Sequence, residues 1–214
     1  MAGAVLWDMD GTLVDSEEYH WIAWRDTMAS QGITITHEQF LATFGQRNDS
    51  ILPKWLGAGT SAERIQCVGD AKEELYRKLV RDRGLAPLPG AVDWVRRLVR
   101  EGWRQAVASS APRANLDVVL EVIGLAGDFH AVVSAEDVTA GKPDPQVFLK
   151  AAERLSQPPE RCIVVEDAAM GVEAARRAGM RCIGVNRNGG LKADVVVRSL
   201  VDLAANAFDV LGHG

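Results

Sequence analysis

The chain has 214 residues and a formal net charge of −5, and 47% of its residues are hydrophobic, which is enough for one large domain or for a core domain with a smaller one. The acidic balance and the lack of a basic run argue against a nucleic-acid partner. The first residues lack the features of a signal peptide, and no apolar run is long enough to cross a bilayer. We therefore expect a cytoplasmic protein without a membrane partner, and we expect it to be a monomer.

The first predicted element is a buried strand, formed by the apolar run from Val5 to Trp7. Asp8 and Asp10 follow it directly, and the alternation of strand side chains points both carboxylates to one side, with Met9 on the other. Two carboxylates at that spacing are costly unless a cation lies between them or one carries a proton. The pair therefore indicates metal-assisted or covalent phosphoryl or acyl chemistry, with a turn carrying two solvated aspartates as the alternative.

Residues from about 16 to 82 are predicted to be helical throughout, and a linker rich in Gly and Pro follows from Gly84 to Gly90. A capping box that starts at Thr60 and ends at Glu63 is expected to open the longest helix of this block. The predicted helices run from Glu17 to Gln31, from Glu38 to Phe44, from Asp49 to Leu56, and from the capping box to about Asp82.

From Gly90 onward, short apolar strands alternate with amphipathic helices. The predicted strands are Arg104 to Ser109, His130 to Ser134, Arg161 to Glu166 and Arg181 to Asn186, and the predicted helices are Val92 to Val99, Pro112 to Ile123, Asp144 to Leu155 and Ala168 to Ala178. This alternation is typical of a parallel sheet with helices on both faces. We therefore expect a doubly wound α/β core made of residues 1–15 and 85–214, with residues 16–84 inserted after its first strand as a helical cap domain.

Polar side chains also follow the later strands. Ser109 and Ser110 end the second strand at a helix start, Lys142 follows the third strand, and Glu166 and Asp167 end the fourth. Because the carboxyl ends of parallel strands meet at one crevice, we expect these groups to lie beside the two aspartates. Carboxylates, a hydroxyl, a lysine and free amides suit Mg²⁺ and a phosphate. Taken singly, the ordinary alternatives are a helix cap, a solvated lysine and a surface loop.

With these motifs in this order, the chain resembles the haloacid dehalogenase superfamily, in the subgroup with a helical cap after the first strand of a Rossmann-like core. Within that subgroup it is most similar to β-phosphoglucomutases and related sugar-phosphate phosphatases, which share the spacing of Tyr19, His20 and Trp24 from the aspartates. The resemblance implies that Asp8 is the nucleophile that forms an aspartyl-phosphate. It implies that Asp10 is the general acid and base.

The resemblance also implies roles for the other groups in the crevice. Ser109 and Lys142 would hold the transferring phosphoryl group. The ligands of Mg²⁺ would be Asp8, the backbone carbonyl of Asp10, Glu166 and Asp167. We further expect Asp10 to stay protonated near neutral pH when the cap removes it from water, so that it can protonate the leaving alcohol.

The cap is expected to contact the substrate. His20 and Trp24 are four residues apart on one helix face, and the resemblance gives His20 the role of supporting Asp10. Arg47 and Lys72 match cap residues of the mutases and are predicted to bind substrate, with a solvated surface position as the alternative for both.

One run of the sequence bears on the choice between a phosphatase and a mutase. A mutase needs a second, distal phosphate site, which in β-phosphoglucomutases uses a cap arginine and a Ser-Lys-Asn run after the second strand. The aligned run here is Ala111, Pro112 and Arg113, so the hydroxyl and the lysine are absent and only Arg113 could restore positive charge. The distal site is therefore expected to hold phosphate weakly, and Ser110 and Arg113 are the predicted substrate contacts of this segment. We therefore expect a Mg²⁺-dependent phosphatase acting on a small phosphorylated metabolite, of the sugar-phosphate class. A phosphosugar mutase is the alternative, followed by a non-catalytic protein that binds such metabolites.

Overall fold

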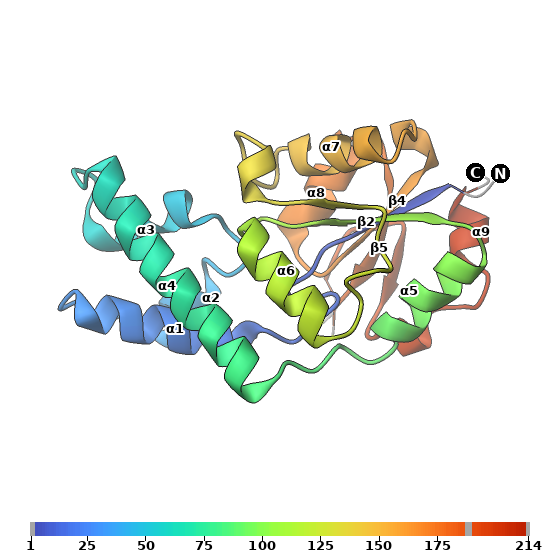
Figure 1. Ribbon diagram of the computed structural model, residues 1–214. Helices are drawn as coiled ribbons and strands as arrows, with labels where there is room; N and C mark the ends of the chain where they lie inside the picture. The colour runs from blue at the N-terminus through green and yellow to red at the C-terminus, as the bar shows by residue number, and fades with distance from the viewer. Residues whose placement is uncertain (1–2, 187–189, 213–214) are drawn as a thin grey trace.

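The protein was analysed as a computed structural model that describes residues 3–186 and 190–212. Its centre is a six-stranded parallel sheet of order β3-β2-β1-β4-β5-β6 (Figure 1). The strands are β1 (Ala4–Trp7), β2 (Arg104–Ala108), β3 (Ala131–Val133), β4 (Cys162–Glu166), β5 (Arg181–Val185) and β6 (Val195–Val197). The predicted doubly wound core is confirmed, and the four strands predicted after residue 90 are present to within one residue at each end.

The sheet separates two hydrophobic layers, because side chains alternate along β1. Val5 and Trp7 face one layer, and Ala4 and Leu6 face the other. The first layer is covered by α5 (Ala91–Arg100), α6 (Arg113–Val122) and α9 (Ala207–Gly212), and the second by α7 (Gln146–Arg154) and α8 (Ala169–Arg177). None of the described helices is both long and apolar enough to cross a membrane.

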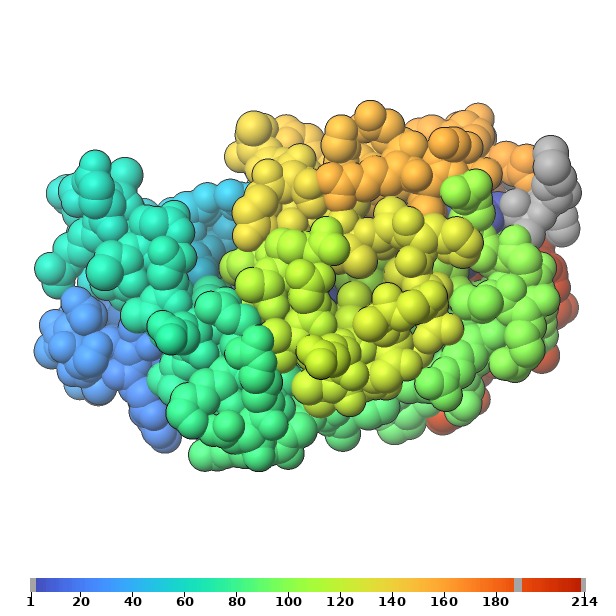
Figure 2. Space-filling view, in the orientation of Figure 1, coloured from blue at the N-terminus to red at the C-terminus, as the bar shows by residue number. Residues whose placement is uncertain are grey.

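Four helices, called the cap helices below, stand beside the sheet (Figure 1). They are α1 (Glu17–Ser30), α2 (His37–Leu41), α3 (Asn48–Leu56) and α4 (Ala62–Arg83). They enclose a hydrophobic cluster of their own, which includes Trp24, Met28, Phe40 and Leu52. Helix α4 also packs on α6, so the cap helices and the core meet along one side, as Figure 2 shows.

The start of α4 differs by one residue from the predicted capping box. Thr60 still belongs to the preceding turn, since its backbone N–H donates to the carbonyl of Gly57 (3.1 Å). Ser61 is the N-cap instead, and its hydroxyl accepts a hydrogen bond from the backbone N–H three residues on (3.3 Å). A complete capping box occurs at α2, between Thr36 and Gln39, where we did not predict one.

Two segments connect the cap helices with the core, and they run side by side. Val14, which follows β1, and Pro87, which precedes α5, form an antiparallel bridge. The backbone N–H of Leu88 donates to the carbonyl of Leu13 at 2.8 Å. The chain therefore leaves the core and returns to it at one place.

Candidate active site

A cavity between the sheet edge and the cap helices holds the two aspartates that follow β1. The backbone N–H of Asp8 extends the sheet by donating to the carbonyl of Val165 (3.0 Å), and a tight turn follows. Gly11 in that turn has a φ of +84°, and a Cβ there would lie 2.1 Å from Oδ2 of Asp167, so only glycine fits. The cavity brings together ten of the predicted site residues: Asp8, Asp10, His20, Trp24, Lys72, Ser109, Ser110, Lys142, Glu166 and Asp167.

The ammonium group of Lys142 lies between two carboxylates. Its Nζ is 2.5 Å from Oδ1 of Asp8 and 2.7 Å from Oε2 of Glu166. Burial disfavours the charged form, but the two carboxylates outweigh it and raise the pKa of Lys142 above its ordinary value. The alternative of a solvated lysine is wrong, because only 6% of the Lys142 side chain is exposed. Lys142 is therefore a fixed buried cation, suited to an anionic phosphoryl group.

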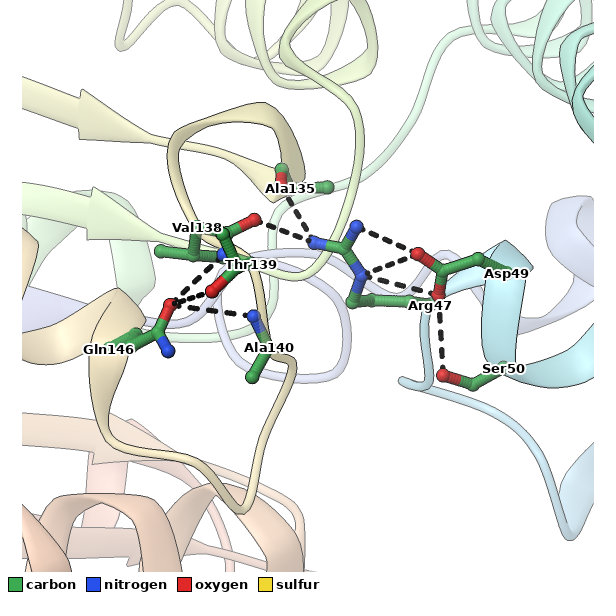
Figure 3. Close-up of polar contacts among 8 residues, drawn as sticks. All are labelled: Arg47, Asp49, Ser50, Ala135, Val138, Thr139, Ala140 and Gln146. Carbon is green, nitrogen blue, oxygen red and sulfur yellow. Dashed lines mark hydrogen bonds and ion pairs between the residues drawn. The ribbon is translucent and has the colours of Figure 1, made fainter.

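The loop that carries Lys142 is held in place by Gln146, the first residue of α7. Its Oε1 accepts hydrogen bonds from the backbone N–H (2.9 Å) and hydroxyl (3.0 Å) of Thr139 and from the N–H of Ala140 (3.4 Å) (Figure 3). The side chain of Asp144, the predicted N-cap, accepts a hydrogen bond from the backbone N–H of Gln146 (3.0 Å), but the N-cap is Pro145, so α7 begins one residue later than predicted. This bracing fixes the loop from both of its ends.

Three carboxylates, those of Asp8, Glu166 and Asp167, each place an oxygen within 4.8 Å of the other two. Burial and then the charge of Glu166 raise the pKa of Asp8 to about 8 and that of Asp167 to about 9. Carboxylates that repel one another in this way fit a divalent cation with oxygen ligands such as Mg²⁺. Gly171 leaves room for the carboxylate of Glu166, because a Cβ at this position would lie 2.0 Å from that carboxylate. Asp10 was predicted to use its backbone carbonyl, and its side chain is not part of this group.

Ser109 and Ser110 bring polar groups to the cavity from the end of β2. The N–H of Ser109 donates to the carbonyl of Val133 (3.1 Å), and its Oγ accepts a hydrogen bond from the N–H of Ala111 (3.1 Å). Ser109 therefore stabilises the turn before α6 but does not cap that helix, whose N-cap is Pro112 without a side-chain hydrogen bond, and it also lines the cavity. Because its oxygen accepts here, its O–H can still donate to an anionic oxygen.

Asp10 is held by groups of the cap. Its Oδ1 accepts a hydrogen bond from Oγ of Ser16 (2.5 Å) and lies 3.3 Å from Nε2 of His20. The other ring nitrogen of His20, Nδ1, lies 2.9 Å from Nζ of Lys72, and an ammonium group can only donate. His20 is therefore the tautomer with its proton on Nε2, and it donates that proton to Asp10.

These contacts correct one expectation about Asp10. Burial raises its pKa, but the hydrogen bonds from His20 and Ser16 and the nearby positive charge of Lys72 outweigh burial and hold the pKa of Asp10 below its ordinary value. Without substrate, Asp10 is therefore ionised near neutral pH, where we expected it to be protonated. In this state it is ready to accept a proton.

Lys72 is buried, with 2% of the residue exposed, so the alternative of a solvated surface position is wrong for it. Besides His20, its ammonium group contacts Oε1 of Glu73 (2.9 Å) and lies 4.9 Å from the centre of the Trp24 ring. Glu73 lines the cavity, although we did not predict it as a site residue. No sequence signal distinguishes it from the other charged residues of a long helix, because its partners come from distant elements.

Arg47 lies outside the cavity of the catalytic groups. Its Nη1 donates to the carbonyls of Ala135 (2.7 Å) and Val138 (3.4 Å), and its Nη2 contacts Oδ2 of Asp49 (2.8 Å) (Figure 3). It thereby joins the cap to the loop that carries Lys142, and it lines a separate outer pocket. The structure does not bring this predicted substrate contact to the catalytic groups.

Arg113 also lies away from the predicted site. Its Nε pairs with Oδ1 of Asp117 (2.8 Å) on the exposed surface of α6, and its backbone N–H donates to the carboxylate of Glu136 (3.0 Å). Neither pocket described here includes Arg113 among its lining residues. Of the predicted substrate contacts, the two arginines are therefore the ones that the structure leaves out of the cavity.

A sheet edge with these carboxylates and a buried lysine, beside helices inserted after the first strand, defines a capped α/β protein whose site suits a phosphoryl group and a divalent cation. Residues 2–179 match the family model of haloacid dehalogenase-like hydrolases, and the chain belongs to that family.

The chain is also similar to curated proteins. Hexitol phosphatase B of Escherichia coli (strain K12) is 32% identical, and the match covers 98% of this chain and 96% of that protein. The chain is also 37% identical to the Arabidopsis thaliana protein SUPPRESSOR OF QUENCHING 1, chloroplastic, over 85% of its own length but only 18% of the length of that protein.

Solved structures share the whole architecture, cap included. A β-phosphoglucomutase from Clostridium difficile superposes with a TM-score of 0.89 at 27% identity, over 99% of this chain and 97% of that one. CbbY from Rhodobacter sphaeroides, solved in complex with xylulose-(1,5)bisphosphate, gives a TM-score of 0.84 at 27% identity, over 95% of this chain and 97% of that one. The relatives therefore include a phosphatase and a phosphosugar mutase.

Proposed function

We propose that this chain is a Mg²⁺-dependent phosphatase that hydrolyses a small phosphorylated metabolite of the sugar-phosphate class through an aspartyl-phosphate on Asp8. The observation that carries the proposal is the position of Lys142, whose ammonium group lies between Asp8 and Glu166 beside a third carboxylate. A nucleophile, a buried cation and oxygen ligands for Mg²⁺ at one sheet edge are the parts that phosphoryl transfer needs. The phosphatase and mutase relatives support the same class of chemistry.

In the first half of the reaction, a carboxylate oxygen of Asp8 attacks the phosphorus atom, and the bond from phosphorus to the substrate oxygen breaks. Lys142 and the O–H of Ser109 hold the phosphoryl oxygens. When bound at the acidic cluster, Mg²⁺ would supply further positive charge to them. The leaving oxygen takes a proton from Asp10, which takes that proton up from water as the substrate binds, because the arriving phosphate dianion raises the pKa of a neighbouring carboxyl.

In the second half, water attacks the phosphorus atom of the aspartyl-phosphate, and Asp10 accepts a proton from that water. The products are inorganic phosphate and the free carboxylate of Asp8. His20 keeps Asp10 oriented for both steps, because its Nε2–H contacts Oδ1 and leaves Oδ2 to face the reactants.

Hydrolysis is favoured over a mutase reaction by the surroundings of the cavity. A mutase must hold a second phosphate, and the two arginines expected to do so, Arg47 and Arg113, have other partners. Ala111 and Pro112, which line the cavity where β-phosphoglucomutases have Ser and Lys, offer no side-chain donor. Water is therefore the expected acceptor of the phosphoryl group.

Two assays test the proposal. Hydrolysis of p-nitrophenyl phosphate with Mg²⁺, and its loss on addition of EDTA, would separate an enzyme from a protein that only binds metabolites. Supplying β-glucose 1-phosphate with glucose 1,6-bisphosphate, and following both glucose 6-phosphate and free phosphate, would separate the two reactions. Predominant release of phosphate supports the phosphatase, whereas faster conversion to glucose 6-phosphate would make the chain a mutase.

A further inference from the structure

A buried carboxylate, that of Glu73, lies at one border of the cavity. There the cavity meets the outer pocket, and this border is called the distal end below. The residues that line both pockets are Asn48, Glu73, Ser110 and Pro112. Of the two pockets, Asp8, Asp10 and Lys142 line only the inner cavity, so a substrate that is held at Asp8 and reaches the outer pocket passes Glu73.

Glu73 is fixed by donors from three elements. Its Oε1 accepts hydrogen bonds from Nδ2 of Asn48 in α3 (2.7 Å) and from Nζ of Lys72 in α4 (2.9 Å). Its Oε2 accepts from Nδ2 of Asn115 in α6 (2.6 Å), which belongs to the core. With 4% of the residue exposed and partners on both sides of the cavity, this charge cannot turn away from a ligand.

The charges around the distal end are mostly negative. The outer pocket is lined by four acidic residues, Asp49, Asp70, Glu73 and Glu136. Among the described residues that line it, the one cation is Arg47, whose guanidinium is already bound to two carbonyls and to Asp49.

The neighbouring cations have partners of their own as well. Lys72, on the inner side, is shared between Glu73 and His20. Arg77 contacts Oδ1 of Asn115 (3.0 Å) and lines neither pocket. A second phosphate placed at the distal end would therefore meet carboxylates without a free cation to bind it.

From this juxtaposition we propose that Glu73 restricts the enzyme to monophosphate esters whose remote end is uncharged and carries hydroxyl groups. The inference rests on the proposed phosphatase function and narrows its substrate class. Hydroxyl groups can donate to the carboxylate of Glu73 and exchange hydrogen bonds with the amide of Asn48. Phosphate oxygens carry negative charge and only accept, as a carboxylate does, so the two groups repel each other. Membership of the family does not by itself decide between monophosphate and bisphosphate substrates, since one relative was solved with a bisphosphate.

The test compares two ligands that differ by one phosphoryl group. Fructose 1-phosphate and fructose 1,6-bisphosphate are titrated by calorimetry into the Asp8→Asn chain with Mg²⁺, so that neither ligand is consumed. The bisphosphate is expected to bind about tenfold more weakly than the monophosphate, because a like charge at the distal end opposes it. Equal or tighter binding of the bisphosphate, or no binding of the monophosphate, would overturn the proposal.

The role of Glu73 itself is tested by adding Glu73→Gln, which keeps the shape, removes the charge and releases Lys72 from its carboxylate. The preference for the monophosphate is expected to fall to about twofold or less. The matched control is Glu74→Gln, the exposed acid next along α4, which is expected to leave the preference unchanged. A folded Glu73→Gln chain that keeps the full preference would contradict the proposal. If the variant does not fold, the ratio of the two affinities measured with Glu73 in place still tests the proposal. Failure of the proposed function would appear separately, as no turnover of p-nitrophenyl phosphate by the unmodified chain.

Discussion

The imidazole of His20 lies flat against the phenol ring of Tyr76, with the ring centroids 4.0 Å apart and the planes 14° from parallel. Tyr76 thus fixes the face of the imidazole, while Asp10 and Lys72 hold its two nitrogens. The ring cannot rotate without losing contacts on its face and on both nitrogens. The orientation of Asp10 therefore depends on a stack between two helices of the cap, α1 and α4.

His20→Ala is expected to lower kcat by about tenfold to a hundredfold, because Asp10 loses the donor that orients it, while KM changes less. Steady-state kinetics with p-nitrophenyl phosphate and Mg²⁺ measures both constants. Tyr76→Phe, which keeps the stacked ring, serves as the control and is expected to stay within a few-fold of the unmodified chain. A change in KM alone for His20→Ala would show that the imidazole contacts substrate and does not position Asp10.

The two aspartates after β1 are expected to respond differently to substitution. Asp8→Asn removes the nucleophile and should abolish turnover, whereas Asp10→Asn removes a general acid and base and should lower kcat by about two to four powers of ten. Circular dichroism would check that both variants fold. Near-native activity of Asp8→Asn would refute its assignment as the nucleophile.

Mg²⁺ is expected to raise the Tm of the chain by several degrees, because the ion binds the acidic cluster only in the folded state. Gly171→Ala should remove most of that increase, since its Cβ would lie 2.0 Å from the carboxylate of Glu166. The control is Gly69→Ala in α4, where the nearest atom to a Cβ lies at 3.5 Å. That variant should be more stable by about 1 kcal/mol, as alanine favours a helix over glycine, and should keep the response to Mg²⁺. An unchanged response in Gly171→Ala would place the ion elsewhere.

Asp137 is expected to contribute stability that depends on pH. Burial raises its pKa, but hydrogen bonds from Arg154 and Ser134 outweigh burial and hold the pKa below its ordinary value. A carboxyl with a lowered folded-state pKa stabilises the fold above its unfolded-state pKa of about 4 and loses that contribution as the pH falls through the folded-state value. Asp137→Asn should therefore lower the free energy of unfolding by about 1–2 kcal/mol at pH 7 and by much less at pH 3. Urea titrations at the two pH values measure the difference, and an equal loss at both would rule out the charge as its source.

The sequence predicts well the site residues that lie at the ends of strands. Asp8, Ser109 and Glu166 each follow an apolar run, and the topology of a parallel sheet brings the ends of such runs to one edge. Lys142 is farther along the chain from the strand that precedes it, β3, but it lies in the segment that connects β3 with α7. Local pattern and topology together were therefore enough for these residues.

His20, Trp24 and Lys72 of the cap were predicted correctly to line the cavity, but other contacts of the cap were not predicted. Arg47 was expected at the substrate but binds carbonyls of a loop almost ninety positions away in sequence. Glu73 and Asn115 meet at 2.6 Å across the boundary between cap and core, and neither lies in a motif. Such contacts depend on the rotation of α4 about its axis and on its docking against α6. Helical periodicity fixes the apolar face of a helix but not which polar partner it meets.

The paired segments at Leu13–Leu88 and Val14–Pro87 have a consequence for how this chain can change. Because the inserted segment begins and ends at adjacent points, it can be exchanged for another of different length without altering the distance that the core must span. Recombination at these two points would transfer Glu73 and the cap side of its network while leaving Asp8, Lys142 and the acidic cluster untouched. In this architecture, the inserted segment would carry substrate choice and the groups that orient Asp10 together, whereas the nucleophile and the acidic cluster stay with the core.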